Sequence, residues 1–160
     1  PDDFRSDLDA GLQARTLQIG EKIFEAATCA QCHKVNGKGG SVGPELTDVL
    51  ARLKGDRFSV LREILDPSHH IDPKYAVQVI VLADGRVMTG IVKAENQTSI
   101  SLLTNPESPK PDVIQTSDIE EMYKTSKSMM PKALLDRFTK DEIFELLAYL
   151  VSQGPDKPAP

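Results

Sequence analysis

Cysteine is scarce in this chain of 160 residues: Cys29 and Cys32 are the only two, and they lie three positions apart. A disulfide framework needs more cysteines at wider spacing, so the pattern argues against a disulfide-stabilised scaffold. Long apolar runs are also missing, and no stretch approaches the length of a membrane-spanning helix. The chain has neither a glycine-rich phosphate loop nor a nucleophile elbow, so no substrate site is recognisable.

Basic charge does not dominate either. The 19 Lys and Arg residues are outnumbered by 24 Asp and Glu residues, and the net charge of −5 argues against nucleic acid as the main partner.

The length fits one domain, or one domain with a modest insertion. No signal peptide is visible after Pro1, so we expect a mature product or a piece of a longer chain. Residues 154–160 predict a disordered tail or the start of a linker.

The two cysteines belong to a C-x-x-C-H motif that ends at His33. This motif is the attachment signature of c-type haem. Each thiol adds across one haem vinyl group, and one helical turn gives the two sulfurs the spacing of neighbouring pyrroles. His33 follows at once and is placed to ligate the iron. The motif therefore predicts one haem c per chain, attached through Cys29 and Cys32 and ligated by His33.

Two other uses of the motif compete with haem attachment. A zinc site needs two further ligands at short spacing, and the adjacent His69 and His70 rarely chelate one metal together. A thioredoxin-like redox pair needs a strand before the motif, whereas residues 20–27 have helical periodicity. Both are weaker predictions than haem attachment.

Residues 16–33 predict a single helix that ends in the motif. Gly20 within this helix indicates that another helix approaches closely.

Residues 36–44 contain four glycines and predict a tight, irregular loop. A haem-ligating histidine needs an acceptor for its other ring nitrogen, and the carbonyl of Pro44 is the candidate, with a plain turn as the alternative.

Three segments together resemble class I cytochromes c: Gly20–Phe24 before the motif, Gly43–Leu46 after it, and Met130-Pro131 followed by Phe138–Leu150. A narrower resemblance rests on four segments: Asp66-Pro67-Ser68, Ile71–Tyr75, Asp84–Arg86 and Ser128–Pro131. These recur in this order in the haem-binding domains of planctomycete-type bacteria, which often lie at the C-terminus of larger secreted, dehydrogenase-like proteins. The resemblance covers the chain from Gly20 to Leu150. It departs at Lys132-Ala133, where that family tends to carry a glycine.

The second axial ligand has several candidates: Met88, Met122, Met129, Met130, His69 and His70. Met130 is preferred because Pro131 restricts it to an extended backbone that can present a thioether across a haem face. The resemblance implies the same residue. Met129 is expected to pack in a core, and the two histidines to lie in an exposed loop. Ligation by either histidine would lower the haem potential relative to methionine.

The predicted fold is mainly α, a cytochrome c-like helical haem domain with an inserted antiparallel sheet resembling a small barrel. Helices are expected at 16–33, at 57–65 and after a capping box of Thr139 and Glu142. The last helix has an apolar stripe of Ile143, Leu146, Leu147 and Leu150, expected to pack near Gly20.

The middle of the chain predicts strands instead. Residues 75–83 and 87–95 flank the hairpin signal Asp84-Gly85, and residues 98–104 and 113–115 add two more. The expected division is an N-terminal extension at 1–15, a haem domain at 16–74 and 126–153, an insert at 75–125 and the tail. Removing the insert gives His33 and Met130 an ordinary separation, and a long insertion costs little loop-closure entropy.

These features predict an electron-transfer module and not an enzyme, with a redox partner protein or a fused dehydrogenase-like domain. A haem sensor or haem enzyme with a labile or His-ligated distal site is one alternative, and a redox-inert binding module is another. Lys22, Lys34 and Lys38 are candidates for steering an acidic partner. The insert is a candidate for a homodimer interface. Haem attachment to this motif implies a periplasmic or other extracytoplasmic location.

Overall fold

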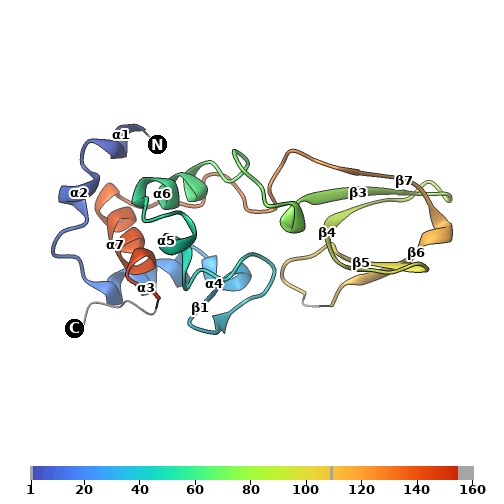
Figure 1. The fold of residues 1–160 in the computed structure, drawn as a ribbon, viewed down its shortest axis with the longest axis horizontal. Helices are drawn as coiled ribbons and strands as arrows, with labels where there is room; N and C mark the ends of the chain where they lie inside the picture. Colours follow the sequence, from blue (N-terminus) through green and yellow to red (C-terminus); the bar gives the residue numbers. More distant parts are fainter. Residues whose placement is uncertain (1, 109, 155–160) are drawn as a thin grey trace. The chain divides into compact units, whose positions relative to one another are not determined.

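The computed structural model describes residues 2–108 and 110–154, and the chain divides into two compact units (Figure 1). The first, here called the helical unit, comprises residues 1–67 and 132–160, and the second, the sheet unit, comprises residues 68–131. Of the predicted tail, residues 155–160 lie outside the described residues. Each unit has a hydrophobic core of its own.

The helical unit contains α1 (Asp2–Arg5), α2 (Leu8–Gly11), α3 (Leu17–Ala26), α4 (Cys29–Cys32), α5 (Val49–Arg52), α6 (Arg57–Leu65) and α7 (Lys140–Val151). A two-stranded antiparallel hairpin, β1 (Lys34–Val35) and β2 (Lys38–Gly39), follows α4. The prediction of α6 is confirmed over its full length. Asp56 caps α6 by accepting a hydrogen bond from the backbone N–H of Phe58.

The packing of α3 against α7 organises the helical core. The capping box of Thr139 and Glu142 begins α7, as predicted, and all four residues of its predicted apolar stripe are buried. Gly20 lies against the backbone carbonyl of Glu145, and a Cβ at Gly20 would lie 2.5 Å from the Cβ of Tyr149. Only glycine permits this approach, so the predicted contact between the two helices is confirmed.

The N-terminal segment also packs into this core. Leu8 is buried, and the ring of Phe4 meets that of Phe144 edge to face at 5.7 Å between centroids. Gly11 lies against the same ring, since a Cβ at Gly11 would lie 2.5 Å from Cε2 of Phe144. Residues 2–15 are thus packed against α7 rather than extending away from it.

The sheet unit contains β3 (Val77–Leu82), β4 (Val87–Glu95), β5 (Ser99–Leu103), β6 (Asp112–Gln115) and β7 (Ile119–Lys124), with short 3-10 turns η1 (Pro73–Tyr75) and η2 (Thr116–Asp118). All neighbours are antiparallel in the order β6-β5-β4-β3-β7. The predicted hairpin at Asp84-Gly85 joins β3 to β4, and Gly85 has a φ of +86°. The core of this sheet contains Ile80, Leu82, Ile100, Leu102 and Ile114.

The prediction of a mainly α fold is wrong. The chain is mixed, because a five-stranded antiparallel sheet with its own buried core stands beside the helices. The sheet is also open rather than a closed barrel, since among the described residues β6 and β7 end the strand order as edges. Strand β7 was not predicted. The described residues include no helix long and apolar enough to span a membrane.

Candidate functional site

The site begins where α3 ends. Sequence periodicity predicts one continuous helix over residues 16–33, but the structure breaks it: Ala27 caps α3 and Thr28 adopts a left-handed conformation with φ 61°. That prediction is therefore wrong at residues 27–28. A non-glycine residue in this region costs free energy that local packing must offset. The break starts a new turn, α4, which carries both cysteines of the motif.

A hairpin after α4 reverses the chain toward the motif. Asn36 and Gly37 have φ values of 50° and 76°, and they connect Val35 to Lys38 in register. Two consecutive positive φ angles define the type I′ hairpin turn that Asn-Gly favours. This dipeptide is a hairpin signal that the prediction of an irregular loop overlooked.

The glycine-rich stretch that follows the hairpin covers the end of α4. The N–H of Gly40 donates to the carbonyl of Ala30 at 2.8 Å, and the N–H of Gly43 donates to the carbonyl of Cys32 at 2.9 Å. These bonds satisfy carbonyls that a helix of four residues leaves without partners. A Cβ at Gly40 would collide with the carbonyl of Gln31, so the loop can lie this close only with glycine there.

Gly43 faces the imidazole ring of His33. A Cβ at Gly43 would lie 2.5 Å from Cε1 and 2.8 Å from Nδ1 of that ring, which is far inside van der Waals contact. The absence of a side chain at this position therefore makes the space that the ring occupies. This contact was not predicted, because the resemblance included Gly43 only as part of the segment Gly43–Leu46 and gave it no role of its own.

His33 Nδ1 lies 2.8 Å from the backbone carbonyl oxygen of Pro44. A carbonyl oxygen only accepts, so Nδ1 carries the proton and donates. In the neutral ring this leaves the lone pair of Nε2 free to bind a metal. Burial lowers the pKa of His33, the hydrogen bond to Pro44 opposes that effect, and the charge of Arg52 adds to it. The neutral form that a metal ligand requires is thus favoured.

Cys29 and Cys32 are both free thiols and both half-buried. Burial raises the pKa of Cys29 to about 11 and also raises the pKa of Cys32. The thiols are separated by one helical turn and are followed directly by His33 with Nε2 free. This donor set, together with the ring space left by Gly43, fits a haem bound by two thioether bonds and one imidazole.

The candidates for the second axial ligand belong to the sheet unit. Met129 and Met130 are half-buried, and His69 and His70 are exposed. The N–H of Met130 donates to Oγ of Ser128 at 3.1 Å. The remaining two methionines lie in the sheet: Met88 packs against its core and Met122 is 38% exposed on β7.

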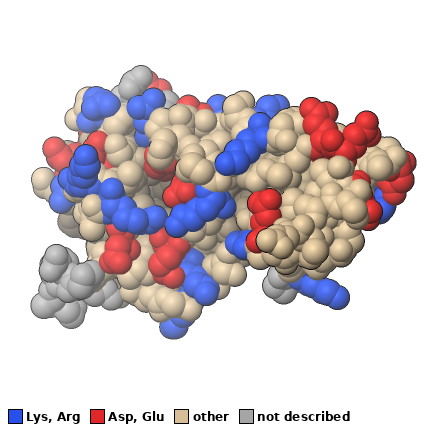
Figure 2. Space-filling view, turned by 45° about the vertical axis from the view of Figure 1, so that its right-hand side comes forward, with Lys and Arg blue, Asp and Glu red and all other residues tan. Residues whose placement is uncertain are grey.

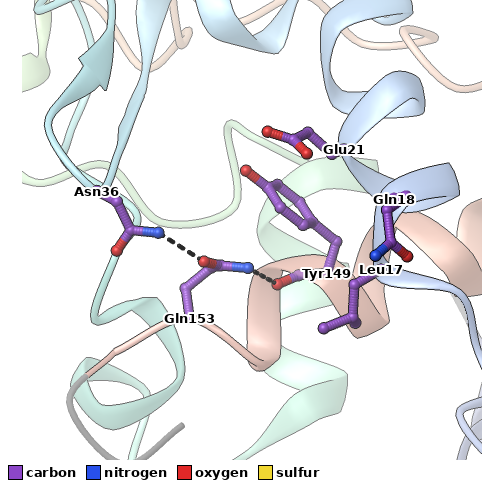
Figure 3. Close-up of a pocket in the computed structure, with 6 residues that line it drawn as sticks. All are labelled: Leu17, Gln18, Glu21, Asn36, Tyr149 and Gln153. Atoms are coloured by element: carbon purple, nitrogen blue, oxygen red, sulfur yellow. Dashed lines mark hydrogen bonds between the residues drawn. The ribbon is translucent and has the colours of Figure 1, made fainter. Parts of the chain in front are cut away.

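A small pocket of about 190 Å³ also lies in the helical unit (Figure 3). Its lining residues are Leu17, Gln18, Glu21, Asn36, Tyr149 and Gln153. Asn36 donates to the side-chain oxygen of Gln153 at 2.7 Å, and Gln153 donates to the carbonyl of Tyr149 at 2.7 Å. Burial, followed by the charges of Glu21 and Glu25, raises the pKa of Tyr149. No predicted haem residue lines this pocket.

Charge is unevenly distributed on the visible surface. Figure 2 shows Lys and Arg side chains interspersed with Asp and Glu on the helical unit, and Asp and Glu gathered at one end of the sheet unit. Among the acidic residues of the sheet unit, Asp118 lies in η2 and Glu120 and Glu121 lie in β7. The predicted docking lysines Lys22, Lys34 and Lys38 belong to the helical unit.

Comparison with known proteins gives one family. Residues 17–80 match the family model described as Cytochrome c. The matched segment contains Cys29, Cys32, His33 and Pro44, and Met130 lies outside it. No curated protein matches the chain. The match supports a c-type cytochrome domain, and its cofactor is covalently bound haem c with iron.

Proposed function

We propose that this chain is an electron-transfer module in which the haem iron is ligated by His33 and Met130. The observation that carries the proposal is the 2.8 Å bond from His33 Nδ1 to the carbonyl of Pro44, which leaves Nε2 free and orients the ring. The haem supplies one-electron chemistry at its iron, while the protein supplies attachment, axial ligands and an apolar setting. Cys29 and Cys32 provide the two thioether links.

Burial and backbone bonding favour Met130 as the second ligand. A thioether is a flexible and neutral donor, so its occupancy depends on how well the protein holds it in place. Met130 is half-buried, its N–H is bonded to Ser128, and Pro131 restricts its backbone to extended conformations. His69 and His70 are exposed side chains, for which ligation would require leaving solvent.

The cellular setting follows from this role. Haem attachment to this motif places the chain in the periplasm or another extracytoplasmic compartment. The partner is a redox protein or a fused dehydrogenase-like domain, consistent with the resemblance to planctomycete-type haem-binding domains. The open edges of the sheet at β6 and β7 offer unpaired strands for a homodimer.

The test is a set of absorption spectra of the ferric and ferrous protein, wild type and Met130→Ala, with Met129→Ala as the matched control. We expect the wild type to show the weak far-red band of methionine-ligated ferric haem. Met130→Ala should lose this band and Met129→Ala should retain it. Loss of the far-red band in Met129→Ala alone would assign the ligand to Met129.

A wild type without the band would contradict methionine ligation. Spectra of His69→Ala and His70→Ala would then identify an imidazole ligand, if one is present. An open or histidine-ligated distal position would favour the haem sensor or haem enzyme over electron transfer.

A further inference from the structure

We infer that Ser68 and Ser128 are positioning residues for the Met130 ligand. This inference rests on the proposed His33/Met130 ligation. Oγ of Ser128 accepts a hydrogen bond from the N–H of Met130 at 3.1 Å. The N–H of Ser128 donates to Oγ of Ser68 at 3.0 Å, across 60 positions of sequence. Both hydrogen bonds are partly buried, so water competes with them less than it does at an open surface.

The two serines join the ends of the sheet unit. Ser68 is its first residue, and Ser128 lies three positions before its last, Pro131. The N–H of Thr125 donates to the carbonyl of Val77, the first residue of β3, at 2.8 Å. The segment that carries Met130 is thus attached at two points, to strand β3 and to the segment that begins the unit.

The bond between Ser68 and Ser128 also bears on the competing ligands. His69 and His70 follow Ser68 directly, so the bond between the serines connects the methionine segment to the histidine segment. An imidazole is a strong iron ligand and a thioether a weak one, so methionine ligation needs the methionine held in place and the histidines held in solvent. Both histidines are exposed in the structure. Breaking the serine bond loosens both segments at once.

The test measures how tightly exogenous imidazole binds to the ferric holoprotein, because imidazole must displace Met130. Removing one hydrogen bond of this kind should tighten imidazole binding about 3- to 10-fold in Ser68→Ala and in Ser128→Ala. The far-red band should weaken and the reduction potential should fall in the same variants. Ser128→Thr keeps a hydroxyl acceptor and should restore wild-type values.

Ser126→Ala is the matched control, since Ser126 is exposed in the same segment. It should change imidazole affinity by less than about 2-fold. Urea unfolding followed by far-UV circular dichroism reports any general loss of stability separately. The inference is overturned if wild type has the far-red band and both serine variants bind imidazole as Ser126→Ala does. A wild type that lacks the band overturns the ligation proposal itself, and the positioning role with it.

Discussion

Nδ1 of His33 donates to the carbonyl oxygen of Pro44 at 2.8 Å. The ring lies so close to Gly43, the residue before that proline, that a side chain at Gly43 would collide with it. Two consecutive residues therefore act on one imidazole in different ways. Pro44 sets the tautomer and the direction of the ring, and Gly43 provides the space for it. The N–H of Gly43 is itself bonded to the carbonyl of Cys32, which ties this stretch to the motif.

Gly43→Ala should displace the ring of His33, because the new Cβ would lie 2.5 Å from its Cε1 atom. Overpacking of this kind costs about 1–3 kcal/mol in unfolding free energy. We expect a lower haem content per polypeptide, measured by the pyridine haemochrome assay, and a lower midpoint of urea unfolding.

The control for that substitution is Gly37→Asn. A Cβ added at Gly37 would meet no other part of the chain within 4 Å. The φ of Gly37, +76°, is one that asparagine tolerates. Normal haem content in this control shows that the loop accepts a side chain where there is room. Equal haem content in Gly43→Ala and wild type would contradict the crowding at His33.

Local patterns in the sequence predicted many individual elements well. Helix α6 and strand β4 have the predicted bounds, because Asp56 caps the first and the Asp84-Gly85 turn starts the second. The capping box at Thr139 placed the start of α7 in the same way. Each of these signals acts over a few residues, so no knowledge of the tertiary structure was needed.

Elements fixed by tertiary contacts were missed. Strand β7 is an edge strand with mostly exposed residues, so it has no apolar alternation to reveal it, and pairing with β3 defines it. The left-handed Thr28 interrupts a sequence with continuous helical periodicity. The mainly α prediction was wrong for a related reason: strand patterns do not tell whether a sheet has its own core.

Ala133→Gly should stabilise the protein. Ala133 has a φ of 67°, a left-handed conformation that is unfavourable for alanine and free of that cost for glycine. The narrower sequence resemblance implies a glycine in this segment. After the added flexibility of glycine in the unfolded chain, we expect a gain of about 0.5–1 kcal/mol in urea unfolding.

Ala51→Gly is the control, because the same substitution should lower the stability there. Ala51 is exposed in α5, where glycine should cost about 0.5–1 kcal/mol. A stability loss of similar size in both variants would show that Ala133 is not left-handed in solution.

Leu8→Ala should test whether the N-terminal segment belongs to the helical core. Leu8 is only 8% exposed and packs in the core cluster. Truncation of a buried leucine costs about 2–4 kcal/mol, and urea unfolding of the holoprotein measures it. Leu17→Ala is the control, because Leu17 is 39% exposed and should cost clearly less. Equal losses would mean that residues 2–15 are not held against α7.

Glu142 should make the stability of α7 depend on pH. Its carboxylate accepts hydrogen bonds from the backbone N–H of Thr139 at 2.8 Å and from the Thr139 hydroxyl at 2.9 Å. These two bonds lower the pKa of Glu142, the backbone bond contributing more. A carboxyl whose pKa is lower in the folded state stabilises it above the unfolded-state pKa, and this contribution is lost as pH falls through the folded-state value.

Glu142→Gln should remove this pH dependence while keeping the capping geometry, since glutamine also completes a capping box. At neutral pH wild type should be the more stable protein, because a negative charge favours the N-terminus of a helix. On acidification below the ordinary range of a glutamate pKa, the difference in urea midpoint between the two proteins should close. Glu120→Gln, on exposed strand β7, controls for the loss of one negative charge. The two variants could instead differ from wild type in urea midpoint by the same amount at every pH. In that case the carboxylate of Glu142 does not stabilise the start of α7 through its charge, and the lowered pKa has another origin.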